Sequence, residues 1–181
     1  MKGFSLALGL LALSACTPKA VQTPAPAGPA TLDSSGYGPV KIGMTPAEAE
    51  AALGKRLVPD MDFDEPAVCQ TLHAEGAQRE KADVTYLAEK GRLSRISAYA
   101  PASMVKTPQG VGPGSDDADI RKIYGAAAIE QKAAYDDPPA HDFVIWRTVN
   151  TRGLRFEIGA DGKAFALHAG GPAILYMEGC L

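Results

Sequence analysis

The composition of this chain is that of an ordinary globular protein. It has 181 residues, of which 46% are hydrophobic and 22% charged, and its formal net charge is −3. These values exclude disorder throughout, and an acidic chain without a basic run lacks the usual surface for nucleic acid. We therefore expect one domain or two half-domains, with no nucleic-acid partner.

The N-terminal residues have the features of an export signal. Lys2 supplies a positive start, and residues 4–13 form an uncharged apolar run, which is too short to cross a bilayer because a spanning helix needs about 20 residues. Residues 13–16 (Leu-Ser-Ala-Cys) resemble the bacterial lipobox, in which signal cleavage leaves Cys16 as a lipid-modified N-terminus. The alternative is an ordinary signal peptide that is cut near Ala15.

The lipobox resemblance implies an anchored protein. Residues 1–15 are then a lipoprotein signal peptide, and residues 16–35 are the lipidated cysteine with a disordered linker rich in Pro and Ala. More than one acyl chain anchors a protein stably in a membrane. Thr17 stands where lipoproteins retained in the inner membrane of some bacteria carry Asp, so the resemblance implies the outer membrane, with the folded part in the periplasm.

Two cysteines remain once Cys16 is set aside. An even pair in an exported chain favours a disulfide, because the compartment outside the cytoplasm is oxidising. We expect Cys69 to pair with Cys180, which would tie the last residues to the first half of the chain. Two buried free thiols are the alternative.

Residues 36–105 are expected to form a first helix-plus-sheet unit. Thr45 is a suitable N-cap, Pro46 suits the first helical position, and Glu48 completes a capping box. Gly54 ends the helix. Strands are expected at 40–42, 68–72, 84–88 and 93–99.

Residues 106–181 are expected to form a second unit in the same order. Asp116 is the expected N-cap of a helix that carries Ile120, Ile123 and Tyr124 on its apolar side and ends at Gly125. Three glycines are spaced by 11 and then 37 residues in each half, which indicates a tandem duplication. Strands are expected at 143–149, 154–158 and 164–169, with an edge strand at 173–177.

The fold class expected from this pattern is α+β, with two tandem units of one helix and an antiparallel sheet. A bare sheet edge invites pairing with other chains, so the two sheets are expected to join into one.

Two families share parts of this pattern. Residues 42–45 (Ile-Gly-Met-Thr), Glu48 and residues 53–54 resemble the opening motif of small outer-membrane lipoproteins of the SmpA/OmlA type, which belong to the β-barrel assembly machinery. The repeated unit also resembles the fold of the secreted β-lactamase inhibitor protein. The first resemblance implies binding to another envelope protein in outer-membrane assembly or maintenance. The second implies inhibition of a periplasmic or secreted hydrolase of the β-lactamase or lysozyme class, as the alternative function.

The sequence contains no familiar catalytic or metal-binding motif. A nucleophile elbow, a phosphate-binding loop and a His-Glu-x-x-His pair are all missing, and the three histidines lie far apart. We therefore expect a protein that is not an enzyme and has no cofactor or metal site.

The densest charge lies in the segment 136–142. Asp136, Asp137, His141 and Asp142 stand beside two prolines, and we take these four residues as a candidate partner-contact loop. Carboxylates at this density could also hold a cation or serve a hydrolase as acid and base. The plain alternative is an exposed acidic loop.

Overall fold

The computed structural model describes residues 30–60, 68–77, 81–148 and 151–180. The signal segment and Cys16 lie outside the described residues. The fold class is α+β, and most of the structure is antiparallel sheet. No helix within the described ranges is long and apolar enough to span a membrane.

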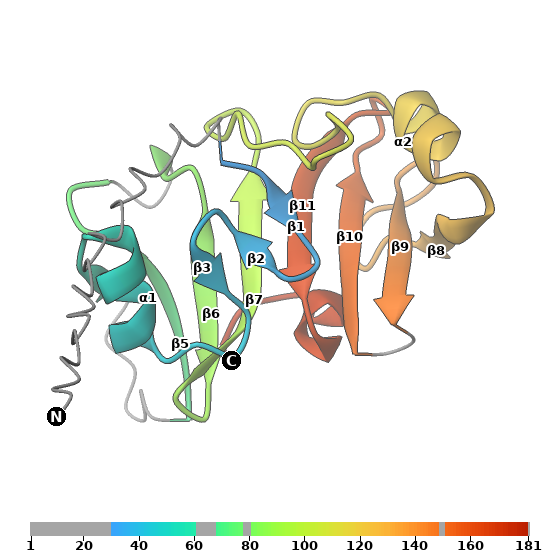
Figure 1. Cartoon of the computed structure of the whole chain (residues 1–181). Helices are drawn as coiled ribbons and strands as arrows, with labels where there is room; N and C mark the ends of the chain where they lie inside the picture. Colours follow the sequence, from blue (N-terminus) through green and yellow to red (C-terminus); the bar gives the residue numbers. More distant parts are fainter. Residues whose placement is uncertain (1–29, 61–67, 78–80, 149–150, 181) are drawn as a thin grey trace, which may run out of the picture.

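Eight antiparallel strands form one continuous sheet (Figure 1). Its two central strands come from different halves of the chain, with Tyr99 opposite Ala166 and Arg95 opposite Gly170. In sheet order the strands are β4 (Leu57–Pro59), β5 (Cys69–Ala74), β6 (Thr85–Glu89), β7 (Arg92–Tyr99), β11 (Ala164–Gly170), β10 (Arg152–Ile158), β9 (His141–Thr148) and β8 (Ile129–Lys132).

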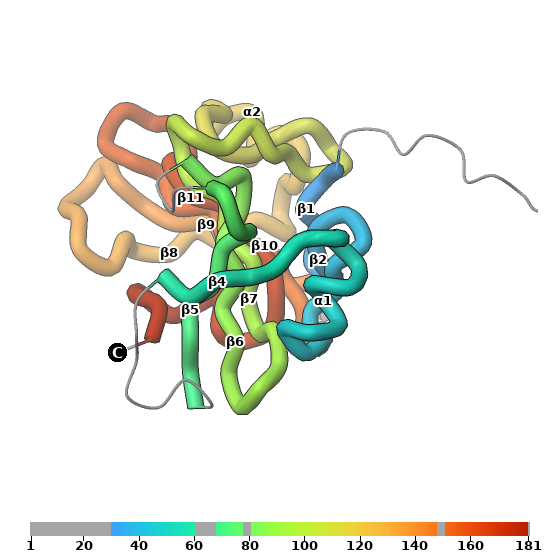
Figure 2. The backbone as a smooth tube through the Cα atoms, turned by 90° about the vertical axis from the view of Figure 1, so that its left-hand side faces the viewer, coloured from blue at the N-terminus to red at the C-terminus, as the bar shows by residue number. Residues whose placement is uncertain are grey.

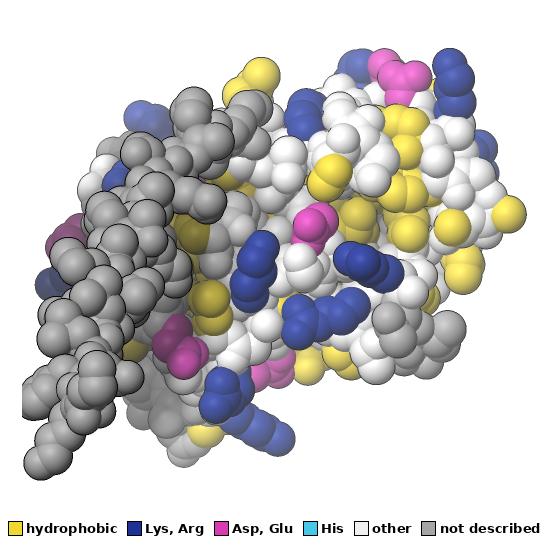
Figure 3. Space-filling model, in the orientation of Figure 1, with side chains coloured by type: hydrophobic (Ala, Val, Ile, Leu, Met, Phe, Trp, Pro, Cys, Tyr) yellow, Lys and Arg dark blue, Asp and Glu magenta, His cyan; other side chains and the backbone are white. Residues whose placement is uncertain are grey.

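One face of this sheet, the helix face, carries the apolar core. It is covered by helix α1 (Pro46–Leu53) and by a small sheet of β1 (Leu32–Asp33), β2 (Gly36–Tyr37) and β3 (Val40–Lys41), and helix α2 (Asp117–Tyr124) packs at its far end (Figures 1 and 2). Ala49 of α1 and Ile120 of α2 are fully buried in this core. Figure 3 shows Lys and Arg side chains in the middle of the outer surface on this side and apolar side chains near α2.

The helix α1 begins and ends as its sequence predicts. Thr45 Oγ1 accepts a hydrogen bond from the Glu48 amide at 3.2 Å, and the Glu48 carboxylate accepts one from the Thr45 amide at 2.8 Å. Gly54 adopts a left-handed conformation with φ of 65°. Asp116 is the N-cap of α2, but its side chain makes no cap hydrogen bond, because its Oδ1 accepts from Lys163 Nζ at 2.6 Å instead. The capping box therefore belongs to α1 alone among these two helices.

The opposite face of the sheet, the tail face, is covered by the C-terminal residues 172–180, which we call the tail. It begins with the 3₁₀ helix η3 (Pro172–Leu175), and Figure 2 shows it on the other side of the sheet from α1. The prediction of an edge strand at 173–177 is therefore wrong. Carbonyl groups of the tail bond to arginine side chains of the sheet rather than to a neighbouring strand.

The end of the linker expected at residues 16–35 belongs instead to the folded structure. The side chain of Leu32 is fully buried in the core, and its amide donates to the carbonyl of Lys106 at 3.0 Å. The short strands β1, β2, β4 and β8 were not among the expected elements. Each has two to four residues, which is too short for an alternating pattern to reveal.

Candidate functional site

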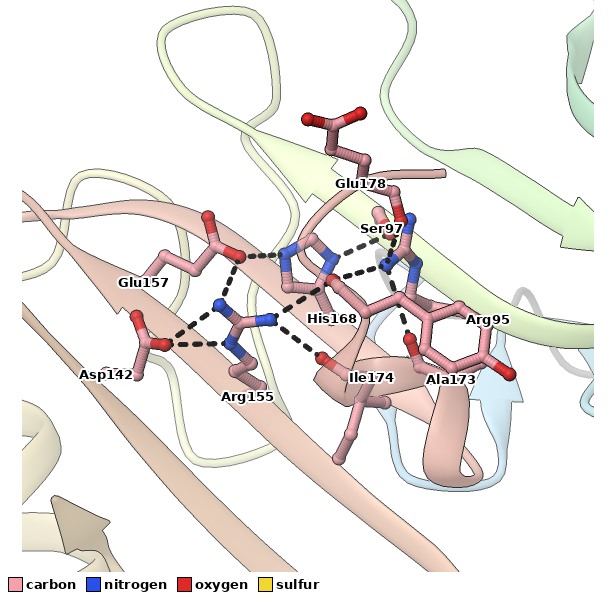
Figure 4. A network of polar contacts seen from close by, with 10 residues as sticks. Arg95, Ser97, Asp142, Arg155, Glu157, His168, Ala173, Ile174 and Glu178 are labelled. Atoms are coloured by element: carbon pink, nitrogen blue, oxygen red, sulfur yellow. Dashed lines mark hydrogen bonds and ion pairs between the residues drawn. The ribbon is translucent and has the colours of Figure 1, made fainter. Parts of the chain in front are cut away.

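A buried ionic network lies between the sheet and the tail, and Arg155 is its centre (Figure 4). Because successive side chains of a strand point to opposite faces, Arg155 lies on the tail face while its apolar neighbours in β10 face the core. Its guanidinium contacts Asp142 Oδ2 at 2.8 and 3.0 Å and Glu157 Oε1 at 3.0 Å. Nη1 donates to the carbonyls of Ile174 and Tyr176, both at 3.2 Å. Arg155 thus joins two strands to the tail.

Arg95 of β7 holds the tail from a second side. Its Nη1 lies 3.3 Å from the carbonyl oxygen of Ala173, 3.1 Å from that of Tyr176 and 3.5 Å from that of Glu178. Its Nε has no hydrogen-bond partner among the described residues, and burial lowers the pKa of Arg95. Arg95 therefore binds the main chain of the tail but keeps one buried donor unused.

His168 of β11 connects Glu157 to Ser97. Its Nε2 lies 3.1 Å from Glu157 Oε1, and its Nδ1 lies 2.8 Å from Ser97 Oγ. Burial lowers the pKa of His168. Burial alone would raise the pKa of Glu157, but the hydrogen bond from His168 and the nearby positive charges lower it. These shifts favour an ionised Glu157 beside a neutral His168 that carries its proton on Nε2 and accepts from the Ser97 hydroxyl.

This Ser–His–Glu sequence of contacts resembles the order of a hydrolase triad, but its position does not suit a nucleophile. Ser97 is 2% exposed, and it does not line either of the cavities beside the tail. A substrate carbonyl cannot reach Ser97 Oγ in this structure. The contacts instead satisfy buried polar groups, which is their usual role in a covered face.

Two adjoining cavities, which we together call the tail groove, open beside this network. Their volumes are about 390 and 450 Å³, and they share Asp60, Thr71, Tyr99 and Gly179. The first is also lined by Arg95, Glu157, His168 and Met177–Cys180, and the second by Ala82, Thr85 and Ala100–Ala102. The groove therefore runs along the tail over β5, β6 and β7 and reaches Glu157 of β10 and His168 of β11.

Exposed apolar side chains border the groove. Tyr99 is 40% exposed, Phe165 40%, Met177 59% and Tyr135 67%. Met177 lines the tail groove with Tyr99, and it lines a smaller cavity with Tyr135 and Phe165. These four residues therefore form a contiguous surface, the tail-face patch.

The structure separates the four residues of the expected partner-contact loop. Asp136 and Asp137 are exposed in the turn between β8 and β9. His141 and Asp142 instead begin strand β9. His141 Nε2 lies 3.8 Å from Asp117, and Asp142 is 5% exposed in its ion pair with Arg155. Burial raises the pKa of Asp142 and outweighs the opposing effect of Arg155. Asp136 and Asp137 are therefore exposed, whereas Asp142 is buried in the network.

The two cysteines Cys69 and Cys180 lie together, with their sulfur atoms 2.08 Å apart in a disulfide. The bond fixes the end of the tail to β5. It therefore closes the tail over the network that Arg95 and Arg155 hold from the sheet side.

Within the described ranges, no group of three or more His, Cys, Asp or Glu side chains is arranged to hold a metal ion. Of the residues that carry the network, only Asp142 was singled out from the sequence, and it was assigned to the partner-contact loop. Arg155 and Glu157 alternate with apolar residues, which is the pattern of an ordinary solvent-facing strand side.

Comparisons with known proteins do not identify the chain: no protein-family model, no curated protein and no solved structure matches it.

Proposed function

We propose that this chain is a lipid-anchored protein of the bacterial cell envelope that binds another protein and does not catalyse a reaction. The observation that carries the proposal is the tail-face patch of Tyr99, Tyr135, Phe165 and Met177. Four exposed aromatic and Met side chains in one contiguous surface are costly to leave in water, and such surfaces are enriched at protein interfaces. The partner is proposed to act in outer-membrane assembly or maintenance.

The proposed anchor is Cys16, with the folded part in the periplasm at the outer membrane. The support is the lipobox-like sequence at residues 13–16 and the disulfide between Cys69 and Cys180, which suits an oxidising compartment. An anchored chain needs only a modest intrinsic affinity for a partner in the same membrane, because anchoring raises the local concentration of both.

The proposal includes a tandem origin for the fold, with units at 36–105 and 106–181. Its support is the order of elements, since α1 precedes β4 to β7 and α2 precedes β8 to β11. The two sets also meet in mirrored order, with β7 and β11 at the centre of the sheet. A tandem repeat of one helix and an antiparallel sheet is also what the resemblance to the β-lactamase inhibitor protein implies.

A second candidate function is inhibition of a periplasmic or secreted hydrolase of the β-lactamase or lysozyme class. The observation that favours it is the exposed turn with Asp136 and Asp137. Asp136 lines the same small cavity as Tyr135 and Phe165, so this turn and the patch could enter a cleft together. Assays of both enzyme classes with the purified chain test this function, and full enzyme activity at saturating chain would exclude it.

The main proposal is tested by affinity capture from detergent-solubilised envelope, with the lipidated chain as bait. We expect a reproducible envelope protein that is lost with the double variant Tyr135→Asp, Phe165→Asp. Ile123→Asp is the matched control, because Ile123 is 41% exposed on α2 and lies outside the patch. Cys16→Ala should reduce capture without abolishing it. Equal capture by the patch variant and the control would contradict the proposal.

A further inference from the structure

The two edge strands of the eight-stranded sheet, β4 and β8, differ in how they are protected. The outward positions of β4 are Leu57 and Pro59, because the main-chain groups of Arg56 and Asp60 bond toward β5. The Leu57 amide already donates to Glu50 Oε1 at 2.8 Å, and a proline has no amide hydrogen. Neither outward position of this edge can therefore donate to another strand.

The edge strand β8 lacks this protection. It lies at the outer end of the sheet beyond β9 (Figure 1), its four residues are all exposed and include no proline, and its ladder with β9 contains no bulge. Within the described ranges, no group outside β9 bonds to its main chain. Alternate residues of an edge strand direct their N–H and C=O groups outward, so β8 can pair with one more strand.

The side chains of β8 restrict which strand fits beside it. Glu130 and Lys132 lie on one face of the strand, and Gln131 lies between them on the other. Glu130 also contacts Arg121 of α2 at 2.9 Å, in an ion pair whose two side chains are about half exposed. Charged residues on an edge deter most strands. Opposite charges two positions apart, however, make β8 complementary to an antiparallel copy of itself.

Only one symmetric register suits both the main chain and the charges. In a two-fold antiparallel pair one residue must face its own copy, because outward-pointing residues of one strand can bond only to those of the other. An axis at Ile129 would pair only the first residue of β8. An axis at Glu130 or at Lys132 would bring like charges together, which is destabilising. An axis at Gln131 pairs each Glu130 with a Lys132 and places two amide side chains within reach of each other.

We infer that β8 is an interface between two copies of this chain, which pair antiparallel about a two-fold axis at Gln131 and join their sheets edge to edge. An interface of four residues is small, so the pairing is weak in dilute solution. In the proposed anchored form, two chains in one membrane meet at high local concentration, which favours the pair. The pairing uses no residue of the tail-face patch and therefore goes beyond the proposed function.

Disulfide trapping tests the register. Gln131→Cys places one thiol of each copy at the axis, where directly opposed Cβ atoms lie about 4.5 to 5.5 Å apart, near the distance that a disulfide needs. The full lipidated chain in detergent micelles is oxidised with copper phenanthroline and separated on a non-reducing gel. We expect about fivefold more covalent dimer than from Asp119→Cys, an exposed control position on α2. Equal dimer from the two variants, or no dimer from Gln131→Cys, would overturn the inference.

Charge exchange tests the pairs on either side of the axis. In the Gln131→Cys chain, Glu130→Lys or Lys132→Glu makes both symmetry-related pairs like-charged and should lower the covalent dimer about tenfold. Both changes in one chain recreate opposite pairs and should restore the dimer. Asp119→Lys is the matched control, because it changes the net charge as Glu130→Lys does, and it should leave the dimer unchanged. Single changes without effect, or a doubly exchanged chain that stays monomeric, would overturn the register.

The outcome is separable from that of the proposed function. If the chain captures an envelope protein through the patch but Gln131→Cys gives no dimer, the β8 interface fails and the proposed function stands. If the dimer is trapped and follows the charge exchange but no protein is captured, the interface stands and the proposed function fails.

Discussion

The two faces of the eight-stranded sheet are buried by different means. On the helix face, apolar side chains such as Leu93, Ile96 and Phe156 pack beneath α1, α2 and the small sheet. On the tail face, two arginines bind main-chain carbonyls of the tail, and the charges of Asp142 and Glu157 balance them. Apolar burial is not directional, whereas the arginine contacts fix one path for the tail. The first face is therefore held by apolar burial, whereas the second fixes the path of the tail and with it the position of the groove.

Removing Arg155 is the most direct test of this difference between the two faces. Arg155→Ala leaves Asp142 and Glu157 buried without their cation and should lower the free energy of unfolding by about 3 to 5 kcal/mol. Arg92→Ala on the helix face should cost about 1 kcal/mol or less, although Arg92 donates to the Gly43 carbonyl at 2.9 Å, because this side chain is exposed. Urea unfolding of both variants gives the comparison. Similar losses of unfolding free energy in the two variants would show that the network does not hold the tail face together.

The disulfide is the second attachment of the tail. It joins residues 111 positions apart, so replacing both cysteines, Cys69→Ser with Cys180→Ser, should cost about 2 to 5 kcal/mol of unfolding free energy. Because the arginines still bind the tail nearer its start, faster amide exchange should appear first in residues 177–180 and only later in β10. Cys16→Ser alone is the control and should leave both quantities unchanged. Uniform acceleration across the sheet would mean that the two attachments are not separate.

The network should also make stability depend on pH. His168 has a pKa below its ordinary value of 6.5 in the folded protein, because it is buried. The unfolded chain therefore binds a proton that the folded chain does not as pH falls below 6.5, and stability decreases by up to about 1.4 kcal/mol per pH unit. His168→Gln should flatten this slope between pH 7.5 and 5.5. Glu157 acts in a lower window, since its pKa lies below 4.5 and its contribution is lost as pH falls below that value. An unchanged slope in the variant would assign the effect to another group.

The same contrast explains what could be predicted from the sequence. Local chemistry was sufficient for the helix face: the cap at Thr45, the stop at Gly54 and the strand positions of β6, β7, β10 and β11 agree with the structure. Each of these signals lies within a few residues of the feature that it determines.

The tail face could not be predicted in this way. Arg95 lies 78 positions from Ala173, whose carbonyl it binds, and no local pattern encodes a contact between a side chain and a distant main chain. Arg155 and Glu157 look like solvent-facing residues until the tail covers them. Asp142 was grouped with an exposed loop because two prolines precede it, although strand β9 has already begun at His141.

The two helix starts give the smallest and most local test of how far sequence determines structure here. Both Thr45 and Asp116 are suitable caps by residue type, but only Thr45 accepts a cap hydrogen bond from its helix, while Asp116 bonds to Lys163 in a hairpin turn. Thr45→Ala should therefore cost about 1 kcal/mol of unfolding free energy. Asp116→Ala should cost about 0.5 kcal/mol or less, because it removes only an exposed ion pair. Equal costs in denaturant unfolding would mean that Asp116 caps α2 in solution after all, and that residue type alone decides the cap.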